Sequence, residues 1–301
     1  MKIAAGMIVF NGEYVLKQCL ESIYPYVSQI CIAEGPVLYW QRKGKITSTD
    51  NTNDIIHGFP DPEDKIKIYH GLYKEKDEQV NAYLQFLDPD TDYLINLDSD
   101  ELYHHDDMEK LIKYIEDEQP TSIGVKSCSF YGGFDKYIGG FEQLKDNFLR
   151  IFKWYPGAGW ETHRPPTVRL QPGQDRKHVD SDTLYERTGI EMMHYSYVFP
   201  KQVYNKINYY YGIGGMGNRI LNYFFDVYWP WVLGDNDTRL KIEKSFNGVH
   251  EYLPHGRIES YTKDFKREHP LPIQNDLPNL KEEFDSQIEH VKEKLHGIHA
   301  H

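Results

Sequence analysis

Apolar and polar positions along the first half of the chain switch repeatedly between strand-like and helix-like spacing. Short apolar runs of strand length, each ending at polar or turn-forming residues, occupy positions 3–10, 29–33, 66–69 and 93–97. Apolar residues spaced three and four apart predict helices near 15–23, 52–56, 80–87 and 108–115. Asn11 is expected to cap the first helix, and Asp106 or Asp107 the last. The alternation predicts an α/β fold with a mostly parallel sheet flanked by helices.

The second half follows a weaker pattern. Strands are expected at 125–131 and 148–154, on either side of a glycine-rich turn. Aromatic residues crowd the region from 204 to 231, where they either pack the core of a helical extension, which we favour, or stack on sugar rings beside a glycine hinge at 212–217. Pro270, Pro272 and Pro278 indicate a linker, followed by an amphipathic helix at 279–295.

Composition narrows the function classes. A formal net charge of −12 over 301 residues lacks the basic footprint of a nucleic-acid-binding protein. The cysteines Cys19, Cys31 and Cys128 have no paired spacing, which is typical of core residues in a reducing compartment and favours a cytoplasmic location. The chain opens on a strand-like run and not on a secretory signal. Its most apolar stretch, 223–233, is about half the length that a membrane span needs, so we expect no transmembrane segment and leave peripheral membrane contact open.

Three carboxylates follow the apolar run at 93–97, in the order Asp98, Asp100 and Glu101. In open α/β sheets, ligands bind at the carboxyl ends of the strands. Two hard oxygen donors placed there suit Mg²⁺ or Mn²⁺ holding a substrate phosphate. An alternative is a calcium loop starting at Asp88, but position six is Tyr93 where glycine is needed and position twelve is Ser99 where glutamate is needed. The sequence therefore favours a metal site at Asp98 and Asp100.

Successive motifs in this half carry a family resemblance. They are Met7-Ile8-Val9-Phe10-Asn11-Gly12-Glu13, Glu34-Gly35, Ser48-Thr49-Asp50-Asn51-Thr52 and Leu97-Asp98-Ser99-Asp100-Glu101. In order and spacing the stretch resembles family 2 glycosyltransferases of the GT-A fold. The resemblance implies a nucleoside-diphosphate-sugar donor with a divalent metal on its diphosphate. The donor-binding residues expected on this basis are Val9, Asn11, Glu34, Asp50, Lys76 and Asp98, and the metal ligands are Asp98 and Asp100. An insertion at 36–47 departs from the family pattern. This insertion is either a surface loop or a segment whose basic and aromatic side chains bind the donor.

Candidate chemistry in the second half centres on Trp160-Glu161-Thr162-His163, which lies between glycine and proline breakers. The resemblance implies a general base near Glu161 for the acceptor hydroxyl, so Glu161 and His163 are the candidate catalytic residues. The alternative is that either side chain only orders the loop. His194 lies in an apolar run and is either a core residue or, as the resemblance implies, a third metal ligand. His104 and His105 follow the acidic motif and are better explained as the solvated start of a helix.

We therefore expect a metal-dependent glycosyltransferase that uses Mn²⁺ or Mg²⁺. It would move a sugar, from UDP-sugar by preference, to a glycan, lipid-linked or small-molecule acceptor, with inversion. The expected division is a donor-binding half at 1–120, an acceptor and catalytic half at 121–200 and a helical extension at 201–301. The alternative of another class is a non-catalytic protein that only holds a nucleotide or glycan. A nucleotidyltransferase needs a glycine-rich basic loop after the first strand. The sequence there is Asn11-Gly12-Glu13, which does not favour this class of enzyme.

Overall fold

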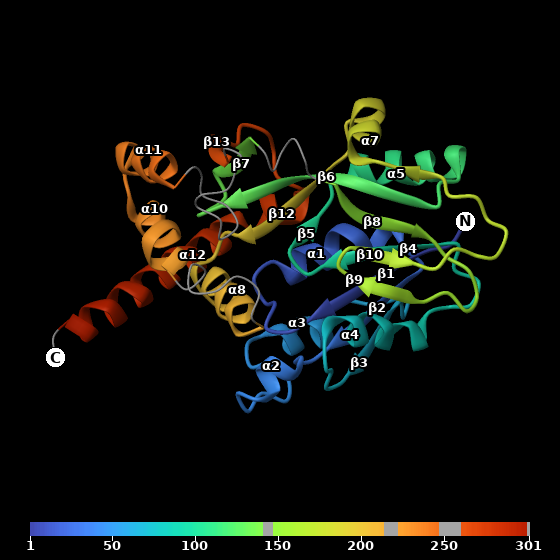
Figure 1. The fold of residues 1–301 in the computed structure, drawn as a ribbon, viewed down its shortest axis with the longest axis horizontal. Coiled ribbons are helices and arrows are strands. Elements are labelled where there is room, and N and C mark those ends of the chain that lie inside the picture. The colour runs from blue at the N-terminus through green and yellow to red at the C-terminus, as the bar shows by residue number, and fades with distance from the viewer. Residues whose placement is uncertain (141–146, 214–221, 247–259, 300–301) are drawn as a thin grey trace. The chain divides into compact units, whose positions relative to one another are not determined.

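The computed structural model describes residues 1–140, 147–213, 222–246 and 260–299 (Figure 1). The chain forms two compact units. Unit 1 comprises Met1–Ser127, Asn147–Met192 and Pro270–Pro272, and unit 2 comprises Cys128–Asp146, Met193–His269 and Ile273–His301. The three-part functional division expected from the sequence stays a prediction.

Unit 1 is built on a mixed sheet in the strand order β6-β8-β4-β1-β2-β3. These strands are β1 (Ile3–Val9), β2 (Gln29–Glu34), β3 (Ile66–His70), β4 (Tyr93–Asp98), β6 (Ser122–Tyr131, shared with unit 2) and β8 (Phe148–Lys153). Strands β1 to β4 are parallel, and β8 runs antiparallel between β4 and β6. Ile8 pairs with Asp98, and Val9 pairs with Glu34, so the acidic residues that end β4 and β2 lie at one edge of the sheet. The predicted α/β sheet is confirmed.

Helices and short strands complete unit 1, and the apolar faces of the longer helices are buried. The helices are α1 (Leu16–Ile23), α2 (Leu38–Gln41), α3 (Thr52–Gly58), α4 (Lys76–Ala82), α5 (His105–Glu118) and α7 (Ser181–Thr188), with 3-10 turns at Tyr24–Tyr26 and Tyr83–Phe86. The short strands are β5 (Glu101–Leu102), β9 (Trp160–His163), β10 (Pro166–Val168) and β11 (His178–Val179). Strands β9 and β10 form an antiparallel hairpin outside the main sheet.

Both predicted helix caps are wrong. Helix α1 is preceded by Val15, with no side-chain cap, and Asn11 instead adopts a left-handed conformation with φ of 50°. Its side chain is used elsewhere, as described below. Helix α5 starts after His104, so Asp106 and Asp107 lie in the first turn, where a carboxylate still interacts favourably with the helix dipole. His105 is exposed at that helix start, as expected.

Unit 2 is held by an aromatic core. Its elements are β7 (Lys136–Gly140), β12 (Glu191–Tyr197, shared with unit 1), α8 (Pro200–Gly212), a π-helical turn (Phe224–Tyr228), α10 (Trp229–Leu233), α11 (Asn236–Ser245), β13 (Ser260–Asp264) and α12 (Leu271–His299). Tyr131, Phe224, Tyr228 and Trp231 are buried in one cluster, which confirms the core-packing interpretation of the aromatic region. Gly132 lies under Trp231, where a Cβ atom would approach the indole to 2.4 Å. The glycine hinge is described only to Ile213, and residues 214–217 lie outside the described part.

The proline-rich linker predicted near residue 270 is wrong. Helix α12 begins at Leu271 and continues to His299, with Pro278 inside it. Pro272 falls in the first turn, where the missing N–H has no intrahelical partner to lose. Pro278 does remove one intrahelical bond, but apolar packing retains the helix because Ile273 and Leu280 on either side are buried. The three cysteines are free and buried, as expected.

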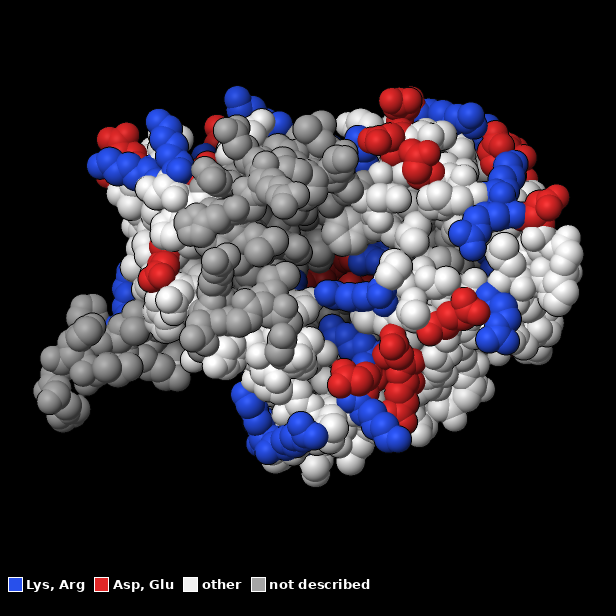
Figure 2. All heavy atoms as spheres, viewed as in Figure 1, with Lys and Arg blue, Asp and Glu red and all other residues white. Residues whose placement is uncertain are grey.

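On the face drawn in Figure 2, acidic and basic side chains are interspersed over the described residues, without a continuous basic stripe. None of the described helices combines the length and the apolar character that crossing a bilayer requires.

Candidate active site

The loops that follow β1 and β2 are joined by side chains of the turn at 47–52. The Asn11 backbone N–H donates to the Ser48 hydroxyl at 2.9 Å, and the Thr49 N–H donates to the Asn11 side-chain oxygen at 2.8 Å. The Gly12 N–H donates to the Thr52 hydroxyl at 2.8 Å. Asp50 accepts from the backbone N–H groups of Glu13 and Thr52, at 3.3 and 3.0 Å. Asn11 and Asp50, both expected donor contacts, therefore also hold this turn in place.

Glu34, at the carboxyl end of β2, is 1% exposed and fully engaged by protein groups. Its Oε1 accepts a hydrogen bond from the Ser48 N–H at 2.8 Å, and its Oε2 accepts one from the Thr47 hydroxyl at 3.2 Å and lies 2.9 Å from His70 Nδ1. The carboxylate thus connects the ends of β2 and β3 to the same turn. Its role in recognising a nucleotide base stays a prediction.

The insertion at 36–47 is an ordered loop with one helical turn, α2. The Gln41 amide closes it by donating to the carbonyl oxygens of Pro36 and Tyr73, at 2.8 and 2.7 Å. Trp40 lies 5.8 Å, centroid to centroid, from Phe10 at the end of β1, and the Lys43 ammonium lies 4.3 Å from the Tyr39 ring centre. The insertion therefore places an aromatic and basic cluster beside the β1 end of the sheet.

Asp98, the last residue of β4, shares a buried arginine with Glu101. The Arg150 guanidinium contacts both oxygens of Glu101, through Nε at 2.7 Å and through Nη2, and Nη2 also lies 3.3 Å from Asp98 Oδ2. Glu101 has no exposed surface, and its Oε2 accepts the Asp98 backbone N–H at 3.2 Å. Arg150 thereby fixes the position of the first carboxylate of the acidic motif.

Asp98 is held in its ionised form. Burial alone would favour the neutral acid, but Arg150, with smaller contributions from His163, Lys76 and Arg164, lowers the pKa of Asp98 well below its usual range. The side chain keeps 33% of its surface exposed. Asp100, two residues on, is half-buried. Two partly exposed carboxylates, one of them strongly ionised, fit the oxygen donors that Mg²⁺ or Mn²⁺ takes alongside substrate phosphates.

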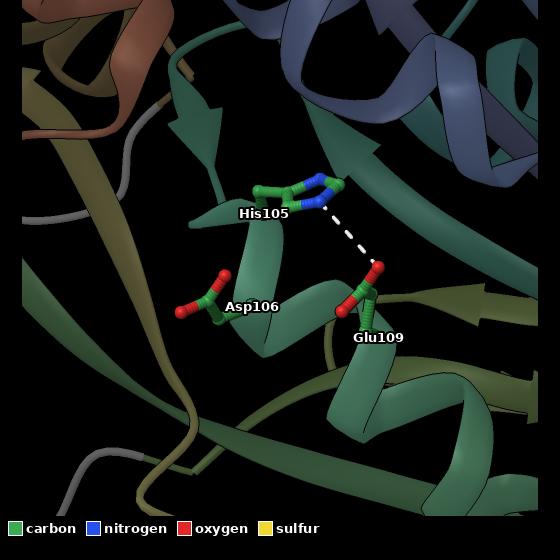
Figure 3. Close-up of side chains that lie close together, drawn as sticks. All are labelled: His105, Asp106 and Glu109. Atoms are coloured by element: carbon green, nitrogen blue, oxygen red, sulfur yellow. Dashed lines mark ion pairs between the residues drawn. The ribbon is translucent and has the colours of Figure 1, made fainter.

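A second acidic group lies nearby in sequence. Among the described residues, His105, Asp106 and Glu109 in the first turn of α5 are the group of histidine and carboxylate side chains close enough to share one ion (Figure 3). The imidazole of His105 lies 3.4 Å from Glu109, and all three residues are exposed. A one-turn i, i+4 pair on a solvated helix is common without a metal, so this group carries no assignment.

Helix α4 is hydrogen-bonded to strand β9 through two residues that lie one helical turn apart. Asn81 and Trp160 exchange hydrogen bonds: the Trp160 N–H donates to Asn81 Oδ1 at 3.1 Å, and Asn81 Nδ2 donates to the Trp160 carbonyl at 3.2 Å. Asp77 Oδ1 accepts the His163 N–H at 2.6 Å. The Trp160 indole donates to Tyr83 at 2.9 Å. The helix that begins at Lys76 therefore also positions the strand that carries Glu161 and His163.

Glu161 and His163 lie in different environments. Glu161 is exposed, and its carboxylate lies 3.2 Å from the exposed guanidinium of Arg169. His163 is 8% exposed, and burial lowers its pKa to about 4, with Asp98 opposing and Lys76 and Arg164 adding to the shift. The electrostatic coupling places His163 near Asp98. Glu161 is open to solvent.

Part of the chain matches a known protein family. Residues 47–164 match the family model described as Glycosyl transferase family 2, a segment that includes Asp50, Lys76, Asp98, Asp100, Glu161 and His163. This segment of the chain therefore resembles family 2 glycosyltransferases. The resemblance noted in the sequence is confirmed, and the observed sheet flanked by helices is the fold class that it implied. None of the curated proteins matches the chain.

Solved structures similar to this chain share little sequence with it. They include TarS 1–349 of S. aureus, which is 12% identical with a TM-score of 0.36, where the match covers 75% of this chain and 71% of that one. The same protein in complex with UDP-GlcNAc is 11% identical over 82% and 80%, also with a TM-score of 0.36. The 4-diphosphocytidyl-2C-methyl-D-erythritol synthase of Anaerococcus prevotii is 12% identical over 50% and 70%, with a TM-score of 0.30. Scores at this level support no conclusion about function.

The structure adds residues that sequence reasoning missed. Arg150 is a charged residue in the apolar strand β8, and a charge at such a position is the sequence feature that could have indicated its role. Asp77 and Asn81 had no signal, because their partners on β9 lie about 80 positions away. Val9, the remaining expected donor contact, is buried in β1. His194 belongs to unit 2, so its metal role stays a prediction.

Proposed function

We propose that the enzyme transfers a sugar from a nucleoside-diphosphate-sugar, UDP-sugar by preference, to a hydroxyl acceptor with inversion at the anomeric carbon. The observation that carries this proposal is Asp98: a strongly ionised carboxylate at the carboxyl end of a central strand, coupled to Arg150, Lys76 and Arg164, inside the matched family segment. Carboxylates among cations at this edge of an α/β sheet suit a diphosphate bridged by a divalent ion.

The donor side of the site divides its work among three groups of residues. The turn joined to Asn11, Glu34 and Asp50 would hold the nucleoside, and Lys76 would place a positive charge near the diphosphate. Asp98 and Asp100 would hold Mn²⁺ or Mg²⁺. When bound, this ion supplies positive charge that stabilises the departing diphosphate. Arg150 keeps Asp98 ionised and in position.

The acceptor side rests on Glu161. In the proposed step the acceptor hydroxyl gives its proton to the Glu161 carboxylate, while its oxygen bonds to the anomeric carbon on the face opposite the diphosphate. The bond from that carbon to the phosphate oxygen breaks, and the electron pair leaves with the nucleoside diphosphate. Because Glu161 is exposed and pairs with Arg169 only at the surface, an entering acceptor can displace that contact at little cost.

Calorimetry with UDP in Mn²⁺, and again in EDTA, tests the donor site. We expect binding that EDTA abolishes and that Asp100→Ala loses. Asp106→Ala is the matched control, since it removes an aspartate from the exposed group on α5 and should leave binding intact. Equal UDP affinity in EDTA would contradict the metal role. Asp100→Ala should keep the melting temperature of the metal-free protein, because removing one of several clustered carboxylates relieves repulsion.

A further inference from the structure

Among the described residues, His163 has two buried side-chain atoms without a hydrogen-bond partner, whereas Thr91 and Tyr103 have one such atom each. Both ring nitrogens are buried and lack a hydrogen-bond partner among the described residues, although the residue is only 8% exposed. Other buried polar side chains of unit 1, such as Glu34, Gln79 and Arg150, have partners. A buried polar group without a partner costs stability, so two such atoms in one ring need an explanation.

Backbone contacts on both sides of His163 hold the residue in this buried position. Its N–H donates to Asp77 at the start of α4, and its neighbour across the β9–β10 hairpin is Pro166. The backbone N–H of Trp160, three residues earlier, donates a hydrogen bond to Asn81, which also belongs to α4. The imidazole is therefore positioned before any ligand arrives, and such positioning reduces the ordering cost of binding.

Charged groups from three elements act electrostatically on the ring. Asp98 ends β4, Lys76 and Asp77 begin α4, and Arg164 follows His163 in the hairpin turn. At neutral pH the ring is uncharged, since burial lowers its pKa to about 4. A neutral imidazole has one N–H donor and one acceptor nitrogen. Lys76 and Arg164 both contribute positive charge at this ring, so an anionic oxygen is the partner that suits the N–H donor and the two cations.

We propose that His163 is a donor-binding residue whose neutral ring donates an N–H to a phosphate oxygen of the nucleoside diphosphate. This inference rests on the proposed function and adds to it a specific contact. It also assigns different sides of the reaction to two neighbours on β9: Glu161 to the acceptor and His163 to the leaving group. The hydrogen bond leaves the proton on the ring throughout, so His163 acts by binding and not by proton transfer.

Binding measurements on His163 variants test the inference. The probes are the tightest-binding of UDP, GDP and CDP, and its parent nucleoside. A hydrogen bond to a charged group corresponds to about 10- to 100-fold in affinity. We expect His163→Ala to lose that factor for the nucleoside diphosphate and nothing for the nucleoside. His163→Asn or His163→Gln should recover part of the loss, because their amides place an N–H near Nδ1 or Nε2. His178→Ala removes an exposed imidazole elsewhere in unit 1 and should change neither affinity.

The outcomes separate this inference from the proposed function. If wild type binds a nucleoside diphosphate and His163→Ala binds it equally, the contact is refuted and the donor site stands. If His163→Ala weakens nucleoside and diphosphate alike and lowers the melting temperature, His163 only orders the hairpin, which also overturns the inference. If wild type binds none of the nucleoside diphosphates, the proposed function fails and the inference with it.

Discussion

At the scale of single residues, the site depends on one guanidinium shared by two carboxylates. Arg150 and Glu101 are both buried, and Asp98 joins them from a more exposed position. Burying three charges is costly, and their mutual attraction repays that cost only while the set is complete. Asp98 is therefore available to a ligand in a fixed, ionised state because two other residues hold it.

The first prediction is that Arg150→Met destabilises the protein by about 3–5 kcal/mol, because it leaves Glu101 charged and unpaired in the interior. Arg169→Met is the control, since the pair of Arg169 with Glu161 is exposed and should contribute less than about 1 kcal/mol. Urea unfolding measures both. The double variant Arg150→Met with Glu101→Leu should recover much of the loss, and a similar cost for Arg150→Met and Arg169→Met would contradict the argument.

The second prediction concerns Glu161. Glu161→Gln should lower sugar transfer by roughly 10²–10⁴-fold, the usual contribution of a general base, and leave UDP affinity nearly unchanged. Single-turnover rates with a radiolabelled UDP-sugar, compared with calorimetry, separate the two effects. Wild-type transfer by Glu161→Gln would place the base elsewhere, and a product that retains the donor's anomeric configuration would exclude single-step inversion.

At the scale of secondary structure, α4 serves both halves of the proposed reaction. Its first residue, Lys76, is an expected donor contact, and its exposed face holds β9 through Asp77 and Asn81. Residues four apart lie on the same face of a helix, so one short helix can reach two points along a strand. A shift of this helix would move donor-binding and acceptor-side residues together.

The third prediction is that Asn81→Ala lowers turnover more than it lowers stability. The lost hydrogen bonds contribute about 1 kcal/mol, because water reaches Asn81 and can replace them. Without them β9 is less well held, so Glu161 spends less time in a reactive position. Steady-state kinetics and thermal melts check this, with Gln85→Ala as a control amide that bonds only within its own turn. Unchanged kcat would show that β9 is positioned by other contacts.

At the scale of the whole molecule, two separate cores have different tasks. Every expected donor contact lies in unit 1, whereas the aromatic cluster around Trp231 belongs to unit 2. Trp231 is fully buried, and its indole N–H donates to Glu243 at 2.9 Å. The main role of these buried aromatic residues is therefore to stabilise unit 2.

The fourth prediction is that Trp231→Ala destabilises unit 2 by about 3–5 kcal/mol, the cost of truncating a large core side chain. UDP binding should persist at temperatures where the variant is folded, because the donor contacts lie in unit 1. Phe225→Ala, at a 47% exposed aromatic of the same region, should be nearly neutral. Scanning calorimetry and UDP titrations test this. Loss of UDP binding by folded Trp231→Ala would show that unit 2 contributes to the donor site.

The sequence by itself determined the features that depend on near neighbours in the chain. Apolar spacing located β1 to β4, α1 and α5 because side-chain periodicity is a local property of strands and helices. The same logic placed Asp98 at the carboxyl end of the sheet, since parallel strands end together. It failed where a local rule met distant contacts: Asn11 bonds a turn 38 positions away instead of capping α1, and packing keeps α12 helical through Pro278.

Only the tertiary structure decided which side chains meet. Arg150 reaches Glu101 across 49 positions, and Asp77 and Asn81 hold β9 across about 80. These pairs have no spacing that a sequence could reveal, because folding selects them through the total packing of the sheet and not through local propensity. The buried, unpartnered ring of His163 is of the same kind. The sequence predicts a histidine in a loop, and only the fold shows a buried ring at the end of β9, electrostatically coupled to Asp98, whose two nitrogens lack a partner among the described residues.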